Sequence, residues 1–182
     1  MKKETILLIV IALVVGGLGG VIFSNAKMNS ATGNQAVAAT ASIDYQQKIK
    51  TLQEIVGKAP NNRNAWVQLG HNYFDSDQPM KAIEAYDKAL ELDGNDPNVL
   101  TDQGVMYRRV GWAGKAIENF NQANSLNPQH IQSLFNLGIV YRDDLGEKEN
   151  AKAAWNRYLE ISPTGKEADR VRLMVDHMEN GH

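Results

Sequence analysis

The stretch from Asn64 to Asp93 reads NAWVQLGHNYFDSDQPMKAIEAYDKALELD, and its pattern returns twice further along the chain. The same residues recur 34 positions apart, at Gly70, Gly104 and Gly138 and at Tyr73, Tyr107 and Tyr141. The third copy has one extra residue, within RDDLGEKEN, between the two helices that we expect in it. A fixed period of this length indicates a repeat protein, in which each copy is one small unit of structure.

Each copy is predicted to form two packed helices. The first helix shows apolar or small residues at the spacing i, i+3, i+4 and i+7, which is one helix face: Trp66, Leu69, Gly70 and Tyr73. Ala82 and Tyr86 mark the second helix in the same way. The recurrent glycine has no side chain, so it lets the partner helix pack closely, at a cost of ~1 kcal/mol in helix propensity.

The spacing Trp66-x2-Leu69-Gly70-x2-Tyr73, followed by Ala82-x3-Tyr86, resembles the signature of the tetratricopeptide repeat (TPR). The resemblance implies an all-α, TPR-type helical solenoid with repeats at about residues 63–96, 97–130 and 131–165. One amphipathic helix precedes the repeats, and a stripe of Ala168, Val171 and Val175 predicts a C-terminal capping helix. The folded domain is therefore expected to cover residues 43–182, with three helix pairs between two caps.

The first 23 residues are predicted to form an N-terminal transmembrane anchor. Thr5 to Phe23 is uncharged and follows Lys2 and Lys3, which favours an inside N-terminus. A cleaved signal segment is the alternative, because Ser24-Asn25-Ala26 fits a cleavage site. Residues 24–42, rich in Ala, Ser, Thr and Asn, are expected to be a flexible linker. Either interpretation predicts a domain outside the cytoplasm, on the periplasmic side.

Gly16 and Gly20 form a G-x-x-x-G pattern inside the apolar run. Such a pattern lets two membrane helices approach closely, so it predicts possible self-association of the anchor. Ordinary membrane-helix composition is the plainer interpretation of the same residues.

The composition of the chain and the motifs that it lacks exclude several classes of function. The net charge of −2 and the lack of a basic run exclude a nucleic-acid binder, and the absence of cysteine excludes thiol chemistry and covalent haem attachment. The four histidines show no metal-type spacing, and no nucleophile or phosphate-binding motif is found outside the apolar run. We therefore predict no catalytic residues, no metal and no cofactor.

In TPR proteins the first helix of each repeat lines a concave groove, so the resemblance implies a peptide-binding role for one stripe of these helices. The stripe comprises Asn64, Val67, His71, Phe74, Thr101, Val105, Arg108, Arg109, Phe135, Ile139 and Arg142. Several of its members are apolar where a solvent face is normally polar, which marks a binding surface. The arginines favour an acidic or C-terminal carboxylate group, although a solvated basic edge explains them equally well.

These features predict a membrane-anchored, exported TPR module that binds a peptide or partner protein and performs no chemistry. The layout of anchor, linker and three repeats also resembles the TPR subunits of bacterial cytochrome c biogenesis, which implies an alternative role in presenting an apoprotein. A second alternative is an oligomeric structural scaffold. A groove that holds a ligand distinguishes a binding module from a scaffold that only self-associates.

Overall fold

The computed structural model describes residues 44–180, and all regular structure in that range is helical. A helix over residues 44–58 comes first. Three pairs follow: α2 (Arg63–Asp75) with α3 (Pro79–Leu92), α4 (Pro97–Arg109) with α5 (Ala113–Leu126), and α6 (Ile131–Ile139) with α7 (Lys148–Ile161). A short π-helix, η1 (Val140–Asp144), continues α6, and α8 (Lys166–Asn180) comes last. For this part of the chain the predicted solenoid of eight helices is confirmed.

The predicted anchor (1–23), with Gly16 and Gly20, and the predicted linker (24–42) lie outside the described residues. Among the helices that are described, none combines the length and the apolar character that crossing a membrane requires.

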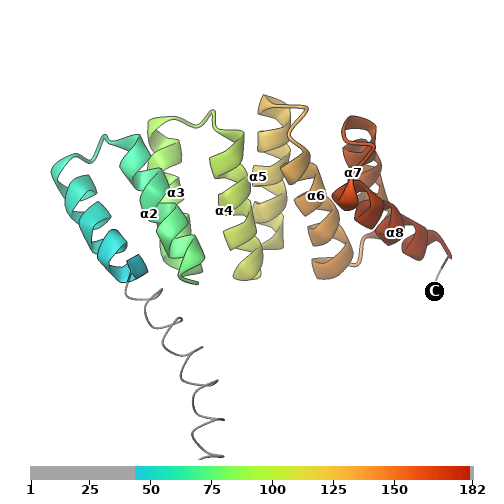
Figure 1. Cartoon of the computed structure of the whole chain (residues 1–182), viewed down its shortest axis with the longest axis horizontal. Coiled ribbons are helices and arrows are strands. Elements are labelled where there is room, and N and C mark those ends of the chain that lie inside the picture. Colours follow the sequence, from blue (N-terminus) through green and yellow to red (C-terminus); the bar gives the residue numbers. More distant parts are fainter. Residues whose placement is uncertain (1–43, 181–182) are drawn as a thin grey trace, which may run out of the picture. The chain divides into compact units, whose positions relative to one another are not determined.

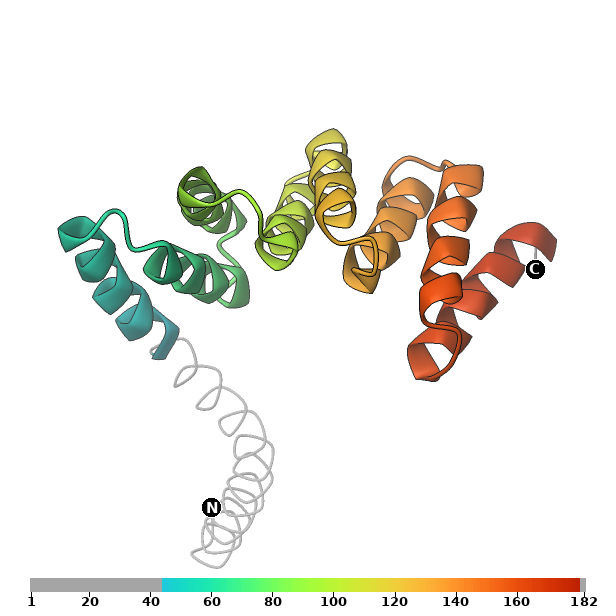
Figure 2. The ribbon, with the colours of Figure 1, turned by 90° about the horizontal axis from the view of Figure 1, so that it is seen from above.

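From Gln47 onward the chain is one compact unit, and its helices stand side by side in chain order (Figure 1). Seen from above, this unit is an arc (Figure 2). The helices α2, α4 and α6 lie in a row along the inside of the arc, while α3 and α5 lie on its outside. We call the side of α2, α4 and α6 on the inside of the arc the inner face.

Each helix pair closes around one glycine and one aromatic ring, which is buried. The pairs are Gly70 with Tyr86, Gly104 with Phe120, and Gly138 with Trp155. A Cβ atom on any of these glycines would overlap the ring of its partner. The close approach predicted from the recurrent glycine is thus confirmed, because the ring fills the space that a side chain would need.

The two ends of the repeat array are covered as predicted. Val56, near the end of the helix over residues 44–58, is buried against the first repeat, as are Ile49 and Leu52. At the other end the buried residues of α8 are Ala168, Val171 and Val175. Most other residues of α8 are polar, because its outer side meets water.

The three first helices begin at equivalent positions of the repeat, and each has a side-chain cap. Asn62 accepts a hydrogen bond from the backbone N–H of Ala65 (3.1 Å), and Asp96 accepts from that of Asn98 (3.0 Å). His130 stands at the same position of the third repeat and accepts from the N–H of Ser133 through Nδ1 (3.4 Å). Side-chain acceptors here satisfy amides that have no partner within the helix.

The turn within each pair is the same in all three repeats. The carbonyl of Tyr73, Tyr107 or Tyr141 accepts a hydrogen bond from the N–H that opens the next helix, at 2.7–2.9 Å. The residue before that donor has a positive φ: Asp77 (55°), Gly111 (79°) and Gly146 (71°). Glycine adopts this backbone conformation without steric cost, whereas aspartate adopts it with some strain.

The third repeat absorbs its extra residue in η1. There the N–H of Leu145 donates to the carbonyl of Val140, five residues back (3.1 Å). Such a π-turn accommodates one residue more than an α-turn. The insertion therefore falls between the two helices, as the sequence indicates, and leaves the positive-φ glycine in its usual place.

Candidate binding site

The predicted groove residues come from the inner helices, except Arg142, which lies in η1, and the structure gives them different degrees of exposure. Asn64, His71 and Arg109 are exposed. Seven others are half-buried, namely Val67, Phe74, Val105, Arg108, Phe135, Ile139 and Arg142. The apolar members thus lie partly open on the inner face, and each helix of the row contributes some of them.

Thr101 is a correction to the predicted groove. It is only 5% exposed, and its Oγ1 lies 3.5 Å from Nδ1 of His130, which is itself buried. Nε2 of His130 also lies 3.1 Å from the side-chain oxygen of Asn98. The start of α6 therefore covers Thr101, and the residue is not available to a partner.

The three arginines of the predicted groove each already have a carboxylate of this chain as a partner. Arg108 donates two hydrogen bonds to Asp144 (2.6 and 3.1 Å). Arg109 pairs with Asp77 (2.9 Å) and lies over the ring of Phe74. A carboxylate from a partner would have to displace one of these acids.

Arg142 completes this set. It donates to both carboxylate oxygens of Asp143 (2.5 and 3.1 Å), and these hydrogen bonds hold the pKa of Asp143 below its ordinary value. Its guanidinium also lies 4.9 Å from the centre of the Trp155 ring. Arg142 therefore helps to fix the third repeat.

A cavity of about 270 Å³ opens on the inner face between α2 and α4, and we call it the inner pocket. Its lining residues are His71, Phe74, Asp75, Tyr86 and Asp102. Nε2 of His71 lies 3.1 Å from Oδ2 of Asp102. This hydrogen bond raises the pKa of His71, and the partial burial of the ring offsets it only in part.

Tyr86 reaches the inner pocket from α3, because Gly70 leaves room for its ring to pass between the helices. The ring meets the imidazole of His71 edge-on, with 5.7 Å between the centroids. The hydroxyl of Tyr86 is buried and has no hydrogen-bond partner in the described part of the chain. Burial, together with Asp102 and Asp75, raises the pKa of this phenol, so it stays protonated.

The equivalent place in the second repeat has neither the acids nor the histidine. Val105 stands in the register of His71, and Phe120 stands in that of Tyr86. Asn136, an uncharged residue, takes the register of Asp102. Arg108 and Arg109 take the registers of Phe74 and Asp75. The inner face is thus acidic at its first junction and without the equivalent acids at its second.

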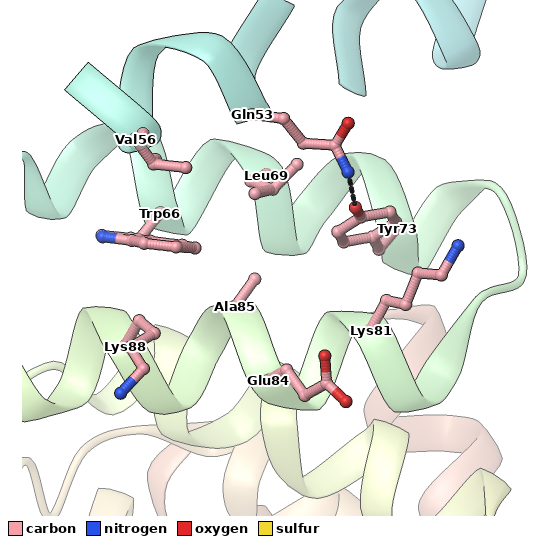
Figure 3. Close-up of a pocket in the computed structure, with 10 residues that line it drawn as sticks. Gln53, Val56, Trp66, Leu69, Tyr73, Lys81, Glu84, Ala85 and Lys88 are labelled. Carbon is pink, nitrogen blue, oxygen red and sulfur yellow. Dashed lines mark hydrogen bonds between the residues drawn. The ribbon is translucent and has the colours of Figure 1, made fainter. Parts of the chain in front are cut away.

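A larger cavity, of about 700 Å³, lies on the opposite side of α2, and we call it the outer pocket (Figure 3). Trp66, Leu69 and Tyr73 of α2 face Ala85 of α3 across it. The remaining lining residues are Gln53, Val56, Gly57, Lys81, Glu84 and Lys88.

The helix face of Trp66, Leu69 and Tyr73 is expected to be core, and Trp66 departs from that expectation. Its ring is only half-buried, and its Nε1 donates to the carbonyl of Pro60 (2.8 Å). Gln53 donates to the hydroxyl of Tyr73 (2.8 Å). A single helix precedes the first repeat where an internal repeat has a full pair before it, so the cover is incomplete.

In the second repeat the equivalent of the outer pocket is filled by a polar network. Gln103, only 2% exposed, takes the register of Leu69. Its amide donates to Asp87 (2.6 Å), and its carbonyl oxygen accepts from Asn119 (2.7 Å). Gln103 departs from the repeat pattern in the sequence, and this network is the structural reason.

Three tetratricopeptide repeat models match the sequence, over residues 64–96, 97–130 and 132–164. Together they cover more than half of the chain. The chain belongs to the tetratricopeptide repeat family.

Among curated relatives, the human protein O-mannosyl-transferase TMTC3 is 32% identical over 108 residues. The match covers 59% of this chain and 12% of that protein. The bifunctional subunit NrfFG of the formate-dependent nitrite reductase complex of Haemophilus influenzae is 30% identical over 110 residues, or 59% of this chain and 29% of that protein. This chain therefore corresponds to a small part of each, and the similarity concerns the repeat region.

Among solved structures, that of MamA superposes with a TM-score of 0.70 at 25% identity and covers 76% of this chain and 78% of that one. The first TPR of Spaghetti (RPAP3), solved with the HSP90 peptide SRMEEVD, superposes with a TM-score of 0.59 at 24% identity and covers 65% of this chain and 91% of that one. These likenesses show the fold of a TPR module, a fold that serves protein interaction.

Proposed function

We propose that this protein is a membrane-anchored, exported TPR module that binds an extended segment of a partner protein along its inner face and performs no chemistry. The observation that carries the proposal is the row of partly open apolar side chains on successive inner helices, among them Val67, Val105 and Ile139. Water contact with such side chains is unfavourable, and a partner segment that covers them gains that free energy.

The groove is not suited to an HSP90-type acidic tail. TPR proteins of that kind hold a terminal carboxylate with Lys and Asn, whereas Val67, His71 and Val105 take those places here. The arginines nearby are bound to acids of the chain itself. We infer that apolar contact, rather than capture of a carboxylate, supplies most of the affinity.

The inner face is tested by replacing Val105 with aspartate, in the full-length chain purified in a mild detergent. A charge placed there becomes buried without a partner when the segment binds, which is unfavourable. We expect at least a ~10-fold loss of affinity, equal to ~1.4 kcal/mol. Leu173→Asp is the matched control, because Leu173 lies on α8 and is 69% exposed.

Partners are first captured from detergent-solubilised membranes and identified by mass spectrometry, and the affinity of each is then measured for both variants. Equal binding by Val105→Asp and the unaltered protein would place the interaction on another surface. Phe135→Asp is a poorer probe than the sequence suggests, because its ring packs beside Tyr158 and below Arg170. We expect that change to lower stability as well as affinity.

The anchor and the export of the domain rest on the uncharged run Thr5–Phe23 and on Lys2 and Lys3 before it. Protease added to intact spheroplasts is expected to digest the domain beyond Ser42. Survival of the domain, with a periplasmic control digested and a cytoplasmic control intact, would contradict export.

A role in cytochrome c assembly is a second candidate, supported by the layout of the chain and by its similarity to part of NrfFG. In that role the partner would be an apocytochrome, and deletion of the gene should lower holocytochrome without lowering the apoprotein. An oligomeric scaffold, with self-association through Gly16 and Gly20, would instead be captured mainly with copies of itself.

A further inference from the structure

The inner pocket carries more negative charge than its own residues neutralise. Asp102 has one partner, His71, at 3.1 Å, and that partner is uncharged whenever the imidazole loses its proton. The ion pairs found within the described residues do not include Asp75, the second acid of the pocket. Two carboxylates thus face a cavity with a single titratable base between them.

The hydroxyl of Tyr86 is an independent sign that the pocket is built for a ligand. It is buried at the pocket and has no partner within the described part of the chain, an arrangement that is energetically costly. Phenylalanine would avoid this cost, and Phe120 shows that the fold accepts phenylalanine in the same register. A partner group that hydrogen-bonds the phenol would remove the penalty.

Size and surroundings restrict what can enter. A volume of about 270 Å³ admits the head group of one side chain and excludes a folded element. One wall is the ring of Phe74, and the guanidinium of Arg109 already lies 5.1 Å from the centre of that ring. A cation of this chain therefore already uses the Phe74 ring, and the attraction for a bound cation has to come from Asp75 and Asp102.

We propose that the inner pocket binds one cationic group, the ammonium of a lysine or the guanidinium of an arginine, on the partner segment. Asp75 and Asp102 balance its charge, and the Tyr86 hydroxyl accepts one of its N–H groups. The inference rests on the proposed function and deepens it, because it names a side chain that the bound segment must present.

His71 makes this binding dependent on pH. The imidazole faces Asp102 from α4, Asp96 at the start of α4, Asp75 on its own helix and the phenol of Tyr86 on α3. The hydrogen bond to Asp102 raises its pKa. A protonated His71 occupies Asp102 and repels a second cation, so affinity for a cation should increase as the pH rises through that pKa.

The test uses the full-length chain in detergent, labelled with ¹³C-histidine, and follows the imidazole signals by NMR. The chain has only four histidines, and a His71→Gln variant assigns the signal of interest. The probes are N-acetyl-lysine methylamide, the arginine analogue, and N-acetyl-norleucine methylamide, which keeps the alkyl chain but has no charge. We expect the two cationic probes to shift the His71 signal, and to bind at least threefold more tightly at pH 8 than at pH 5.5.

Three variants separate the site from general electrostatics. Asp102→Asn should weaken the lysine probe about tenfold, whereas Asp93→Asn, an equal change of charge at the end of α3, should have little effect. Tyr86→Phe should weaken the probe while leaving the melting temperature equal or higher, because it removes the unpartnered hydroxyl.

Equal shifts with norleucine and lysine, or no shift of His71 with either, would overturn the cation site. A partner that depends on Val105 but not on Asp102 would leave the proposed function standing and sink this inference alone. If the lysine probe binds but no partner depends on Val105, the cation site stands and the proposed function fails.

Discussion

The first and second repeats share one backbone plan but differ in the side chains that they place on its two sides. In the first repeat the inner side holds His71 and the unpartnered Tyr86 hydroxyl, and the outer side is an apolar cavity beside Leu69. In the second repeat Val105 and the fully buried Phe120 take the registers of His71 and Tyr86, and the outer side is filled by the network of Gln103. The repeat thus determines the positions of the helices, while a few substitutions decide which side has open polar or apolar space.

The largest expected effect concerns the feature that all three repeats share, the glycine that packs against the ring. We expect Gly138→Ala to destabilise the domain by ~1–3 kcal/mol, because the added Cβ overlaps the fully buried Trp155, which cannot move freely. Gly104→Ala and Gly70→Ala should act in the same direction. The gain in helix propensity, up to ~1 kcal/mol, offsets only part of the loss.

Urea unfolding at constant pH measures these changes. Gly114→Ala is the control, because nothing lies within 4 Å of the Cβ it would add. If Gly138→Ala proved as stable as that control, the ring contact would not be what holds the helix pairs together.

The next effect separates the two outer sides. Gln103→Leu gives the second repeat the residue of the first, and it leaves Asn119 and Asp87 without their amide partner. We expect a loss of about 1–2 kcal/mol, since unpaired buried polar groups are costly. The first repeat has Ala85 at the position of Asn119. Adding Asn119→Ala to Gln103→Leu should therefore restore part of the lost stability.

Chemical unfolding of the two single variants and the double variant gives the coupling between the two changes. Strictly additive losses would mean that Gln103 and Asn119 do not act as one network.

A smaller effect is the pH dependence, which should have opposite sign for the two histidines. His71 has a raised pKa, so its contribution is complete below its ordinary pKa of 6.5 and is lost as the pH rises through the raised value. Burial lowers the pKa of His130, so its contribution is present above 6.5 and is lost as the pH falls toward the lowered value.

We therefore expect His130→Asn to cost more stability at pH 8 than at pH 5.5, and His71→Gln to cost more at pH 5.5 than at pH 8. Unfolding curves for both variants and the unaltered protein, taken at the two pH values, make the comparison. A pH dependence of the same sign for both histidines would contradict their assigned surroundings.

The smallest effect concerns the turn of the first repeat. The other two repeats have Gly111 and Gly146 at the position of Asp77. Asp77→Gly therefore removes the strain of an aspartate with a positive φ. The change also removes the exposed ion pair with Arg109, which contributes ~0–1 kcal/mol. We expect a net gain of a few tenths of a kcal/mol to about 1 kcal/mol, seen as a slightly higher melting temperature. A clear loss would mean that the ion pair outweighs the strain.

The sequence predicts the helices well because the contacts that define them lie within one repeat. Gly70 and Tyr86, for example, belong to the same unit, and their periodic recurrence reveals their packing. Contacts between units are harder to anticipate. Thr101 falls on the expected groove stripe of α4, yet His130 of the next repeat covers it. The buried face of a helix can be predicted from its own sequence. The position of the neighbouring helix along that face cannot.

The same limit applies to the arginines and to the pockets. Arg108 reaches Asp144 because η1 brings that acid back toward α4. This contact depends on the π-helix that accommodates the inserted residue. The outer pocket exists because one helix, rather than a pair, covers Trp66. His130 offered a usable signal, since it stands in register with Asn62 and Asp96, two residues of types that commonly begin helices.

The π-turn of η1 has a consequence for how the sequence of such a chain can change in evolution. An insertion in a helix core rotates every later side chain by about 100°, whereas this one ends within a single turn and passes nothing on to α7. The junction between the helices of a pair is therefore a place where length is free to vary and new surface can be added. Insertions of further residues between Asp144 and Gly146 should be tolerated by the fold, and a tag or a short reactive sequence placed there would report on the third repeat without altering the inner face.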